Sequence, residues 1–584
     1  MPKTRYLVSV AVVQSALAAS SAYAQTDAGS ILQQQNRQET RPAERLPELP
    51  KQKVLSAEVP LSGPRVVIRS LKLDGDDVLV STAEMNLLVK QWVGKEVDFA
   101  GLDRISKQVT ELLRRQRWFL AQAFLPQQDI TEGHIRIAVL QGHLDGANGS
   151  GSPFSVSMDT QKATRIDKSK VEAIASHNLK AGSLANEADL ERTLLVAGDL
   201  PGLTARAQLE PGVNPGATRI VLNVEQGPLV SGSVMADNHG SRFTGVAQIN
   251  AGLLLNDPKG FGDQYTLNVT HAEGLNLARL GYTVPLGANG LKLGAIWSPM
   301  NYKIVQGVGQ TAGLKGNSNN ATVMLSYPIQ RSRVENIYTS LSLNHKAMQD
   351  DSSSGLLKDK RANTLNANLS ADKLDNFAGG GLSNFSLGVT VGQIDLSRLA
   401  ADRDADAAGY NSQGHFEKLN YSLNRLQRLG SHFTLVATLY GQAAGKNLDS
   451  SEKFNLGGPG GVRAYVRGEA TGDSGWVSNL ELRYDWQSLN SSAGQVQLVA
   501  FHDAGRISVH KDTKGLPIST ATGRNNYGLE GWGFGVNLSK SGSHSIRVMW
   551  AQKIGSNPGR TIEGMNSDGR ASASRLLFQG NWFY

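Results

Sequence analysis

The chain ends on the stretch Arg575-Leu576-Leu577-Phe578-Gln579-Gly580-Asn581-Trp582-Phe583-Tyr584, which divides cleanly at a period of two. The even-numbered positions are apolar or aromatic apart from one glycine, and the odd-numbered ones include an arginine, a glutamine and an asparagine. Successive side chains of a strand point to opposite faces, so one face suits lipid and the other a polar interior. A strand of this kind at a sheet edge promotes aggregation unless it pairs with another strand. The stretch therefore predicts a strand that closes a β-barrel, and its aromatic terminal signal is Phe578, Trp582 and Tyr584.

The same alternation extends backwards along the chain to about Leu229. In residues 265–270 and 365–370, apolar positions alternate with Asn, Ser and Thr rather than with Lys and Glu, which suits a water-filled lumen. A soluble β-sandwich shows the same alternation, so periodicity alone leaves both folds open. The terminal strand and an N-terminal signal peptide favour the barrel. Residues 229–584 provide about 22 residues for each of 16 strands with its connection, and about twelve or eighteen strands fit nearly as well.

Residues 1–24 are identified as a secretory signal peptide. Lys3 and Arg5 precede an apolar run over residues 6–18, and a stretch of small residues ends at Ala24. A membrane anchor is the rival interpretation, but Gln14 and the serines interrupt the run. Beyond it, no stretch approaches the roughly 18 apolar residues that a spanning helix requires. The mature protein is therefore expected either to be soluble or to cross a membrane as a barrel.

Residues 25–62 are rich in Gln, Arg, Glu and Pro, and two interpretations carry equal weight. The first is a disordered leader followed by a semi-rigid, proline-rich linker. The second is a polar helix over about residues 28–41 that lies in an aqueous channel, with the prolines as its linker. The residues that would plug the channel are Ile31, Leu32, Gln35 and Gln38.

Residues 63–145 and 146–228 form two similar modules, each with the order β-α-α-β-β. In the first, strands are predicted over 67–73, 121–125 and 134–140, with apolar helical stripes over 85–92 and 102–113. In the second, helices are predicted over 168–175 and 187–196, and strands near 154, 204–209 and 219–224. The repeat indicates two α+β domains ahead of the barrel.

Nothing in the sequence supports catalysis. Residues 472–475 match the Gly-Asp-Ser-Gly around a serine-protease nucleophile, but nothing nearby supplies a base and an orienting carboxylate. His502 and Asp503 are neighbours on a strand and point to opposite faces. The chain has no cysteine, no close histidine pair and no phosphate-binding loop, and its net charge of +8 is weak evidence for nucleic acid. We therefore expect no enzyme activity, no cofactor, no metal, and no nucleotide or nucleic-acid partner.

A glycine-rich stretch, residues 457–461, precedes Val462-Arg463-Ala464-Tyr465. Such a stretch can fold back as a hairpin inside a channel, where the arginine needs a carboxylate partner. The candidate partner is Asp503, on the predicted barrel wall. An exposed loop with scattered charges is the alternative interpretation.

Several short motifs, taken in order, resemble one family. They are Leu125-Pro126-Gln127-Gln128-Asp129-Ile130, Val139-Leu140-Gln141-Gly142, Asp189-Leu190-Glu191-Arg192, Asp199-Leu200-Pro201-Gly202, and Asp237-Asn238 with Gly240-Ser241-Arg242. Their order and spacing are similar to those of the two-partner secretion transporters, outer-membrane proteins within the wider Omp85 superfamily. The resemblance implies a mainly β fold: a transmembrane barrel over 229–584, two periplasmic POTRA modules, and a plug helix ahead of them.

The resemblance also implies a function and partners. Members export a large, β-rich exoprotein of the haemagglutinin, haemolysin or adhesin type, which the periplasmic modules capture unfolded. Outer-membrane lipid and the barrel assembly machinery are further implied partners. An assembly factor for other barrels and a passive porin are the alternatives. An extended chain can add to a strand edge through main-chain hydrogen bonds, and the candidate cargo-binding residues are Glu187, Leu190, Leu194, Thr204, Arg206 and Gln208.

Two positions depart from the family pattern. Residues 462–465 resemble its Val-Arg-Gly-Tyr loop tip, which implies that Arg463 pairs with Asp503, but Ala464 replaces the glycine. A backbone angle that only glycine adopts easily would be strained there. Arg117-Trp118 replaces a Gly-Tyr after the second helix of the first module, which keeps the aromatic residue and is expected to lose the turn.

Overall fold

A computed structural model describes residues 27–36, 65–74, 82–147, 149–158, 164–214, 216–514, 516, 518 and 520–584. The expected signal peptide, residues 1–24, and the proline-rich linker lie outside the described residues. Among the described helices, none is long and apolar enough to cross a membrane.

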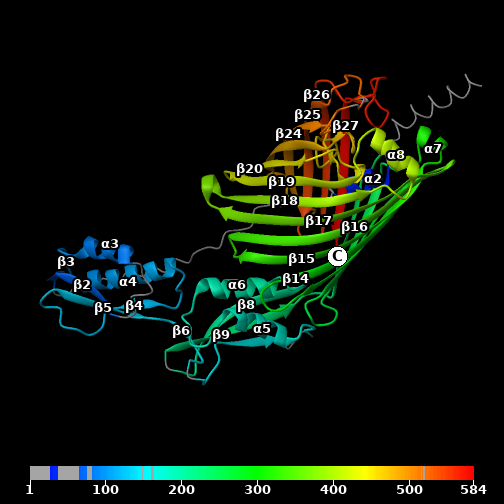
Figure 1. Cartoon of the computed structure of the whole chain (residues 1–584). Coiled ribbons are helices and arrows are strands. Elements are labelled where there is room, and N and C mark those ends of the chain that lie inside the picture. The colour runs from blue at the N-terminus through cyan, green and yellow to red at the C-terminus, as the bar shows by residue number, and fades with distance from the viewer. Residues whose placement is uncertain are drawn as a thin grey trace, which may run out of the picture.

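The C-terminal region is a closed antiparallel barrel of 16 strands (Figure 1). The count of 16 is therefore correct, and twelve and eighteen are excluded. The predicted closing strand is confirmed, because Ser574–Phe583 pairs with Val230–Asp237 from Phe583 opposite Ser233 to Gln579 opposite Asp237. The strands, in barrel order, are β10 (Val230–Asp237), β11 (Gln248–Asn256), β12 (Gln264–Ala272), β13 (Leu275–Pro285), β14 (Lys292–Lys303), β15 (Lys315–Arg331), β16 (Glu335–Ser352), β17 (Gly355–Asp375), β18 (Gly381–Asp395), β19 (Gly414–Leu429), β20 (Phe433–Ala444), β23 (Ser474–Asp485), β24 (Gln495–Ser508), β25 (Asn526–Lys540), β26 (His544–Ile554) and β27 (Ser574–Phe583).

Side chains along the strands alternate between the two sides of the barrel wall. On β17, Leu365 and Leu369 are exposed on the outside, while Asn366 and Asn368 between them are half-buried on the lumen side. On β25, Trp532 and Phe534 face outward and pack around Trp550 of β26, with ring centroids 5.5 and 5.2 Å away. This is the apolar-out, polar-in pattern of a membrane barrel.

The first module packs two helices on a three-stranded sheet in the order β2-β5-β4. Its core contains Ile68, Ile105, Val109 and Ile137. The elements are β1 (Val66–Val67), β2 (Ser70–Asp74), α3 (Thr82–Trp92), β3 (Glu96–Val97), α4 (Phe99–Arg115), β4 (Gln122–Phe124) and β5 (His134–Leu140).

The turn expected to be lost after α4 is in fact present. Arg117 adopts a left-handed φ of 69°, the conformation that a glycine would take. Its carbonyl accepts a hydrogen bond from the Glu187 N–H, and its guanidinium lies 3.3 Å from Glu191. The expectation was wrong because contacts with the second module hold the arginine in a backbone conformation that its residue type does not favour.

The sheet of the second module is built around one central strand that has parallel neighbours on one side and an antiparallel neighbour on the other. The strands β6 (His143–Leu144) and β7 (Phe154–Met158) run parallel to β9 (Ala217–Gln226), and β8 (Leu203–Pro211) runs antiparallel to it. Two helices, α5 (Lys168–Asn178) and α6 (Glu187–Gly198), complete the module. The side chain of Asn186 accepts a hydrogen bond from the Ala188 N–H and thereby caps α6.

An ion pair joins the second module to one end of the barrel. Arg331, at the end of β15, donates to both carboxylate oxygens of Asp199, with distances of 2.8 and 3.0 Å. Lys292 donates to the carbonyl of Asp199 at 2.7 Å, and Arg192 donates to the Pro328 carbonyl at 3.0 Å. We call this end of the barrel the module end. The opposite end, the loop end, carries α7 (Val308–Thr311) and α8 (Ala400–Ala408) in its connections (Figure 1).

Candidate functional site in the barrel lumen

The connection between β20 and β23, residues 445–473, folds back into the barrel, and we call it the lumen loop. It contains η4 (Ser450–Glu452), β21 (Phe454–Asn455) and β22 (Thr471–Gly472). Its tip is fully enclosed, since Val462 and Tyr465 are buried among inward-facing residues of β23 to β27. The predicted alternative of an exposed loop is therefore wrong.

Arg463 at the loop tip binds two carboxylates of the barrel wall. Its Nε and Nη2 donate to the two oxygens of Asp503 at 2.9 and 2.8 Å, and its main-chain N–H donates to the same group at 3.0 Å. Its Nη1 donates to Glu481 at 2.7 Å, and its guanidinium lies 3.6 Å from the centroid of the Phe501 ring. The predicted pair with Asp503 is present, and Glu481 is a second partner that sequence reasoning missed. A bidentate arginine with a second carboxylate fixes the tip in position and orientation.

Ala464 is accommodated without the expected strain. The non-glycine residues with positive φ in the described part of the chain are Arg117, Asp257, Ala378, Asn411 and Ala470, so Ala464 is not one of them. The space for its methyl group comes from the facing strand. A Cβ placed on Gly531 of β25 would lie 2.7 Å from the Cβ of Ala464. The prediction was wrong because the tip residue does not use a glycine-only backbone angle and a glycine opposite receives its side chain.

A short helix, α2 (Ala28–Asn36), lies inside the barrel near the loop end (Figure 1). Ile31 and Leu32 are buried, as is Gln35. The two apolar residues pack into what we call the apolar collar, a set of buried residues from the barrel wall and its connections: Ala272, Leu275, Leu277, Met300, Tyr302, Ile304, Leu314, Met348, Ala362, Ile394, Leu396, Phe416, Ala444 and Leu448. The structure thus places the predicted helix in the channel, over residues 28–36. The fourth predicted plug residue, Gln38, lies outside the described residues.

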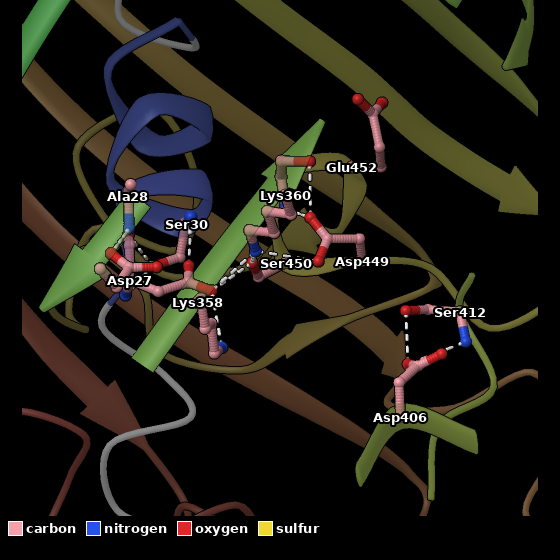
Figure 2. A network of polar contacts seen from close by, with 12 residues as sticks. Asp27, Ala28, Ser30, Lys358, Lys360, Asp406, Ser412, Asp449, Ser450 and Glu452 are labelled. Atoms are coloured by element: carbon pink, nitrogen blue, oxygen red, sulfur yellow. Dashed lines mark hydrogen bonds and ion pairs between the residues drawn. The ribbon is translucent and has the colours of Figure 1, made fainter. Parts of the chain in front are cut away.

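Asp27 connects this helix to both the barrel wall and the lumen loop (Figure 2). Its Oδ2 accepts hydrogen bonds from Lys358 at 3.0 Å, Lys360 at 2.9 Å and the Ser450 hydroxyl at 2.7 Å. Lys360 also donates to Asp449 of the lumen loop at 2.9 Å. We call these five residues the plug network. The side chains of Lys360 and Asp27 are only 1% and 3% exposed, so each depends on the other for charge compensation.

Further contacts fix the start of α2. The Asp27 Oδ1 accepts from the Ser30 N–H at 2.8 Å, as an N-cap residue does. The Ala28 N–H donates to Asp350 at 2.8 Å, and the same Asp350 oxygen accepts from the Tyr302 hydroxyl at 2.6 Å. Sequence reasoning missed Asp27. Its only signal is an acidic residue directly before a helix, three positions after the predicted cleavage site.

A second ionic cluster fixes the base of the lumen loop. Glu452 lies 2.6 Å from Lys346 of β16 and 2.7 Å from Lys418 of β19. Beside it, Lys453 pairs with Asp473 at 2.6 Å, which links the two ends of the loop. The loop is therefore attached to the wall at its base as well as at its tip.

The predicted cargo-binding residues lie on two elements of the second module. Thr204, Arg206 and Gln208 are exposed on β8, which pairs only with β9 in the described part of the module. Leu190 and Leu194 of α6 pack against the module's own core rather than forming an open apolar groove. Glu187 is exposed beside the first module.

Comparisons with known proteins match this architecture. The family model described as haemolysin secretion/activation protein ShlB/FhaC/HecB matches residues 216–538, more than half of the chain. The chain belongs to this family. A model of the ShlB-type POTRA domain matches residues 66–142.

Relatives cover most of the chain. The heme/hemopexin transporter protein HuxB of Haemophilus influenzae strain 86-028NP is 27% identical over 488 residues, covering 83% of both chains. The outer membrane transporter CdiB of Dickeya dadantii is 22% identical over 481 residues, covering 78% of this chain and 79% of the relative. The solved structure of CdiB from Escherichia coli superposes with a TM-score of 0.68 at 19% identity, covering 96% of this chain and 99% of that one, and shows the shared fold.

The protein is therefore an outer-membrane transporter of the two-partner secretion type, which exports an exoprotein from the periplasm to the cell surface. Its POTRA modules lie in the periplasm, so the module end of the barrel is the periplasmic end. BamA from Haemophilus ducreyi lacking POTRA domains 1–3 superposes with a TM-score of 0.50 at 13% identity over 89% of this chain, a likeness that shows a shared fold and no more. Dedicated export thus fits this family member better than assembly of other barrels.

Proposed function

We propose that the structure is the resting state of an export pore in which α2 and the base of the lumen loop leave their positions together. The observation that carries this proposal is the sharing of Lys360 between Asp27 of α2 and Asp449 of the lumen loop. Removing one partner of a buried charge pair leaves the other uncompensated, which costs about 3–5 kcal/mol. Departure of the helix leaves Lys358 without Asp27 and breaks the direct hydrogen bond from Ser450 of the lumen loop to Asp27, so the loop base loses a contact as well.

The export function itself is tested by comparing the culture supernatant and outer membrane of the parent strain with those of a strain that lacks this gene. Quantitative mass spectrometry is expected to show loss of one or two large proteins from the supernatant and an unchanged set of outer-membrane barrels. Broad depletion of other barrels would instead indicate an assembly factor. No change in either fraction would indicate a pore for small solutes.

We further propose that cargo binds by strand addition to β8. This edge strand has nine residues and exposes Thr204, Arg206 and Gln208, whereas the opposite edge strand, β7, has five residues. Main-chain hydrogen bonds along the longer edge bind an extended chain with little demand on its sequence.

The absence of cysteine from the chain permits a clean test of this cargo edge. A Thr204→Cys variant is expected to form a disulfide with a cysteine placed in the cargo's N-terminal domain. A Ser157→Cys variant, on the exposed face of β7, is the matched control and is expected to form little. Equal yields at the two edges would reject β8 as the binding strand.

The remaining proposals concern energy and biogenesis. We propose that the protein catalyses no reaction and that folding of the exoprotein outside the cell biases its transport. Outer-membrane lipid is the expected contact of outward-facing residues such as Leu365 and Trp532. The barrel assembly machinery is the expected partner during biogenesis, because the closing strand ends on exposed aromatic residues. Depletion of that machinery is expected to leave the chain unassembled, which heat-dependent migration on gels measures.

A further inference from the structure

One side of the lumen is lined by uncharged polar residues. On β15 to β19, the positions that alternate with lipid-exposed residues such as Val323, Leu343 and Leu365 face inward. They are the even-numbered positions of residues 320–326, 340–344, 364–370, 384–390 and 420–424. None of them is Lys, Arg, Asp, Glu or His, and most are Asn, Ser or Thr. We call this surface the uncharged wall.

The polar groups of the uncharged wall bond to one another across strands. Thr322 donates to Asn344 at 2.7 Å, and Asn344 donates to Thr364 at 3.1 Å. Thr390 donates to Asn366 at 2.6 Å. A second row continues this pattern, since Ser386 donates to Asn368 at 2.9 Å. Many amides and hydroxyls of this sheet face therefore already have partners within the wall, although the side-chain oxygen of Asn320 has none.

The opposite side of the lumen carries charged residues. There, the inward positions of β23 to β27 include Glu481, Arg483, Asp503, Arg547 and Arg575. The tip of the lumen loop occupies this side through Arg463, and Arg575 donates to the carbonyl of Tyr465 at 2.5 Å. The charged side is thus the one to which the tip of the lumen loop is bound.

We propose that the uncharged wall is the surface along which the exported polypeptide passes as an extended, unfolded chain. An asparagine amide both donates and accepts, so it pairs with either group of an unpaired peptide bond. Each contact with the cargo replaces a hydrogen bond within the wall, or between the wall and water, by one of similar strength. No single contact therefore binds the passing chain tightly. A charged wall would instead retain every cargo side chain of opposite sign and repel those of like sign.

The position of the wall supports this occupant. It begins on the periplasmic side of Lys346, Lys360 and Lys418, which hold α2 and the lumen loop at the loop end. Asn344, Asn366 and Asn368 remain half-buried and accessible from the lumen. Departure of α2 and the loop base would therefore open a route from the modules along these strands to the cell surface. The inference rests on the proposed export function and specifies which side of the pore the cargo touches.

Disulfide trapping tests the contact directly, because the transporter has no cysteine of its own. The probe is the exoprotein identified by the supernatant comparison, fused behind a single cysteine to a domain that folds in the periplasm and stalls transit. Asn366→Cys is expected to trap the stalled chain under mild oxidation. Leu365→Cys on the outward face of the same strand, and Asn537→Cys on the charged side, are the controls and are expected to give several-fold lower yields.

The outcomes separate this inference from the export function. Equal or greater trapping at Asn537, or none at Asn366 while the chain is stalled in the pore, would overturn the uncharged wall as the path. Failure of the unmodified transporter to release the exoprotein would instead overturn the export function.

A second experiment introduces a charge at position 366 and measures the rate at which the exoprotein is released. Asn366→Lys and Asn366→Asp are both expected to slow release of the exoprotein by roughly 10-fold, whatever the sign, because either charge retains part of a mixed sequence. Asn366→Gln is expected to export normally, as is Asn537→Lys. Barrel assembly, judged by heat-dependent migration, should be unchanged in all four. An effect at Asn537 equal to that at Asn366 would contradict the proposal.

Discussion

The lumen contains two buried ionic sites of similar charge but different construction. At the loop tip, Arg463 binds Asp503 through two parallel hydrogen bonds and Glu481 through a third. At the start of α2, Asp27 binds two lysines, and Lys360 is shared with Asp449. Arginine fixes both distance and orientation, whereas an ammonium is a point charge that exchanges partners readily. The comparison indicates that the first site holds the loop tip in one position and that the second is suited to release of the helix.

Among the variants of these two sites, Arg463→Ala should have the strongest effect. This change leaves Asp503 buried without its cation, which costs about 3–5 kcal/mol, and it releases the loop tip, whereas Glu481 keeps Arg483 at 2.7 Å. We expect export of the exoprotein to fall at least about 10-fold while the barrel remains assembled, because the strand ladder does not depend on this side chain. Immunoblots of supernatant and heat-dependent migration of the transporter measure the two effects.

Two further variants show whether the position of the loop tip explains the loss of export. Arg463→Ala combined with Asp503→Asn removes one uncompensated charge and should not restore export if the position of the tip is what matters. Arg425→Ala removes a partly exposed ion pair with Asp375 at the module end of the barrel and should export normally. Normal release of cargo from Arg463→Ala would contradict the role assigned to the tip.

The second prediction concerns the plug network. Asp27→Asn removes the charge that holds α2 against Lys358 and Lys360, so the helix should leave the channel more often. Single-channel recordings in planar bilayers should show conductance between that of the unmodified protein and that of a deletion of residues 28–41, which should be the highest. Because Asp27 lies close to the predicted cleavage site, Lys360→Met tests the same network from the barrel side.

Asp406→Asn is the matched control for the plug network. Asp406 lies in α8 at the same end of the barrel and accepts hydrogen bonds from Ser412 and Gln413, not from α2 (Figure 2). Its removal should leave conductance unchanged. Unchanged conductance after deletion of residues 28–41 would show that the helix does not block the pore.

The parts of this structure that the sequence predicts are those with a local signal. Alternation at a period of two depends only on neighbouring residues, so the closing strand at 575–584 was identifiable without knowledge of its partner. Arg463 stood out because a buried arginine requires a carboxylate. The plug network gave no comparable signal, because Asp27, Lys360 and Asp449 meet only through the three-dimensional path of the barrel.

Backbone conformation was the second feature that the sequence did not predict. Arg117 adopts a left-handed φ although arginine disfavours it, and Ala464 avoids one although a glycine was expected there. Both outcomes depend on neighbours distant in sequence: the second module holds Arg117, and Gly531 provides space for Ala464. Residue type determines which φ is favoured, and tertiary contacts determine whether the residue adopts it.

In the second module, one carboxylate is held by N–H groups instead of cations. Asp145 accepts from the main-chain N–H of Val213 at 2.8 Å and from the side chain of Asn214 at 2.7 Å, which fixes the β8–β9 turn. These hydrogen bonds lower its pKa to about 2. A depressed pKa stabilises the turn above the unfolded value of about 4, and this contribution is lost as the pH falls from about 4 towards 2.

Pepsin digestion of the full chain in detergent measures this effect. Cleavage near the β8–β9 turn should become faster below about pH 3, where Asp145 begins to be protonated. Asp145→Asn should already be cleaved at pH 4. Asp167→Asn, which alters the cap of α5 in the same module, should not change cleavage at this turn. Identical pH profiles for the unmodified chain and Asp145→Asn would contradict the assigned role.

The smallest expected effect is that of Ala464→Gly, which restores the residue found in the family pattern. Because Ala464 does not have a positive φ, the glycine relieves no strain, and it removes one methyl group from a closely packed contact with Gly531. Export should stay within about twofold of the unmodified protein, and the free energy of unfolding should fall by less than about 1 kcal/mol. The reverse change on the facing strand, Gly531→Ala, should be far worse, because the new methyl group would lie 2.7 Å from that of Ala464. Export by the double variant Ala464→Gly/Gly531→Ala should then recover in part, since the two positions share one space; no recovery would show that Gly531 is needed for another reason.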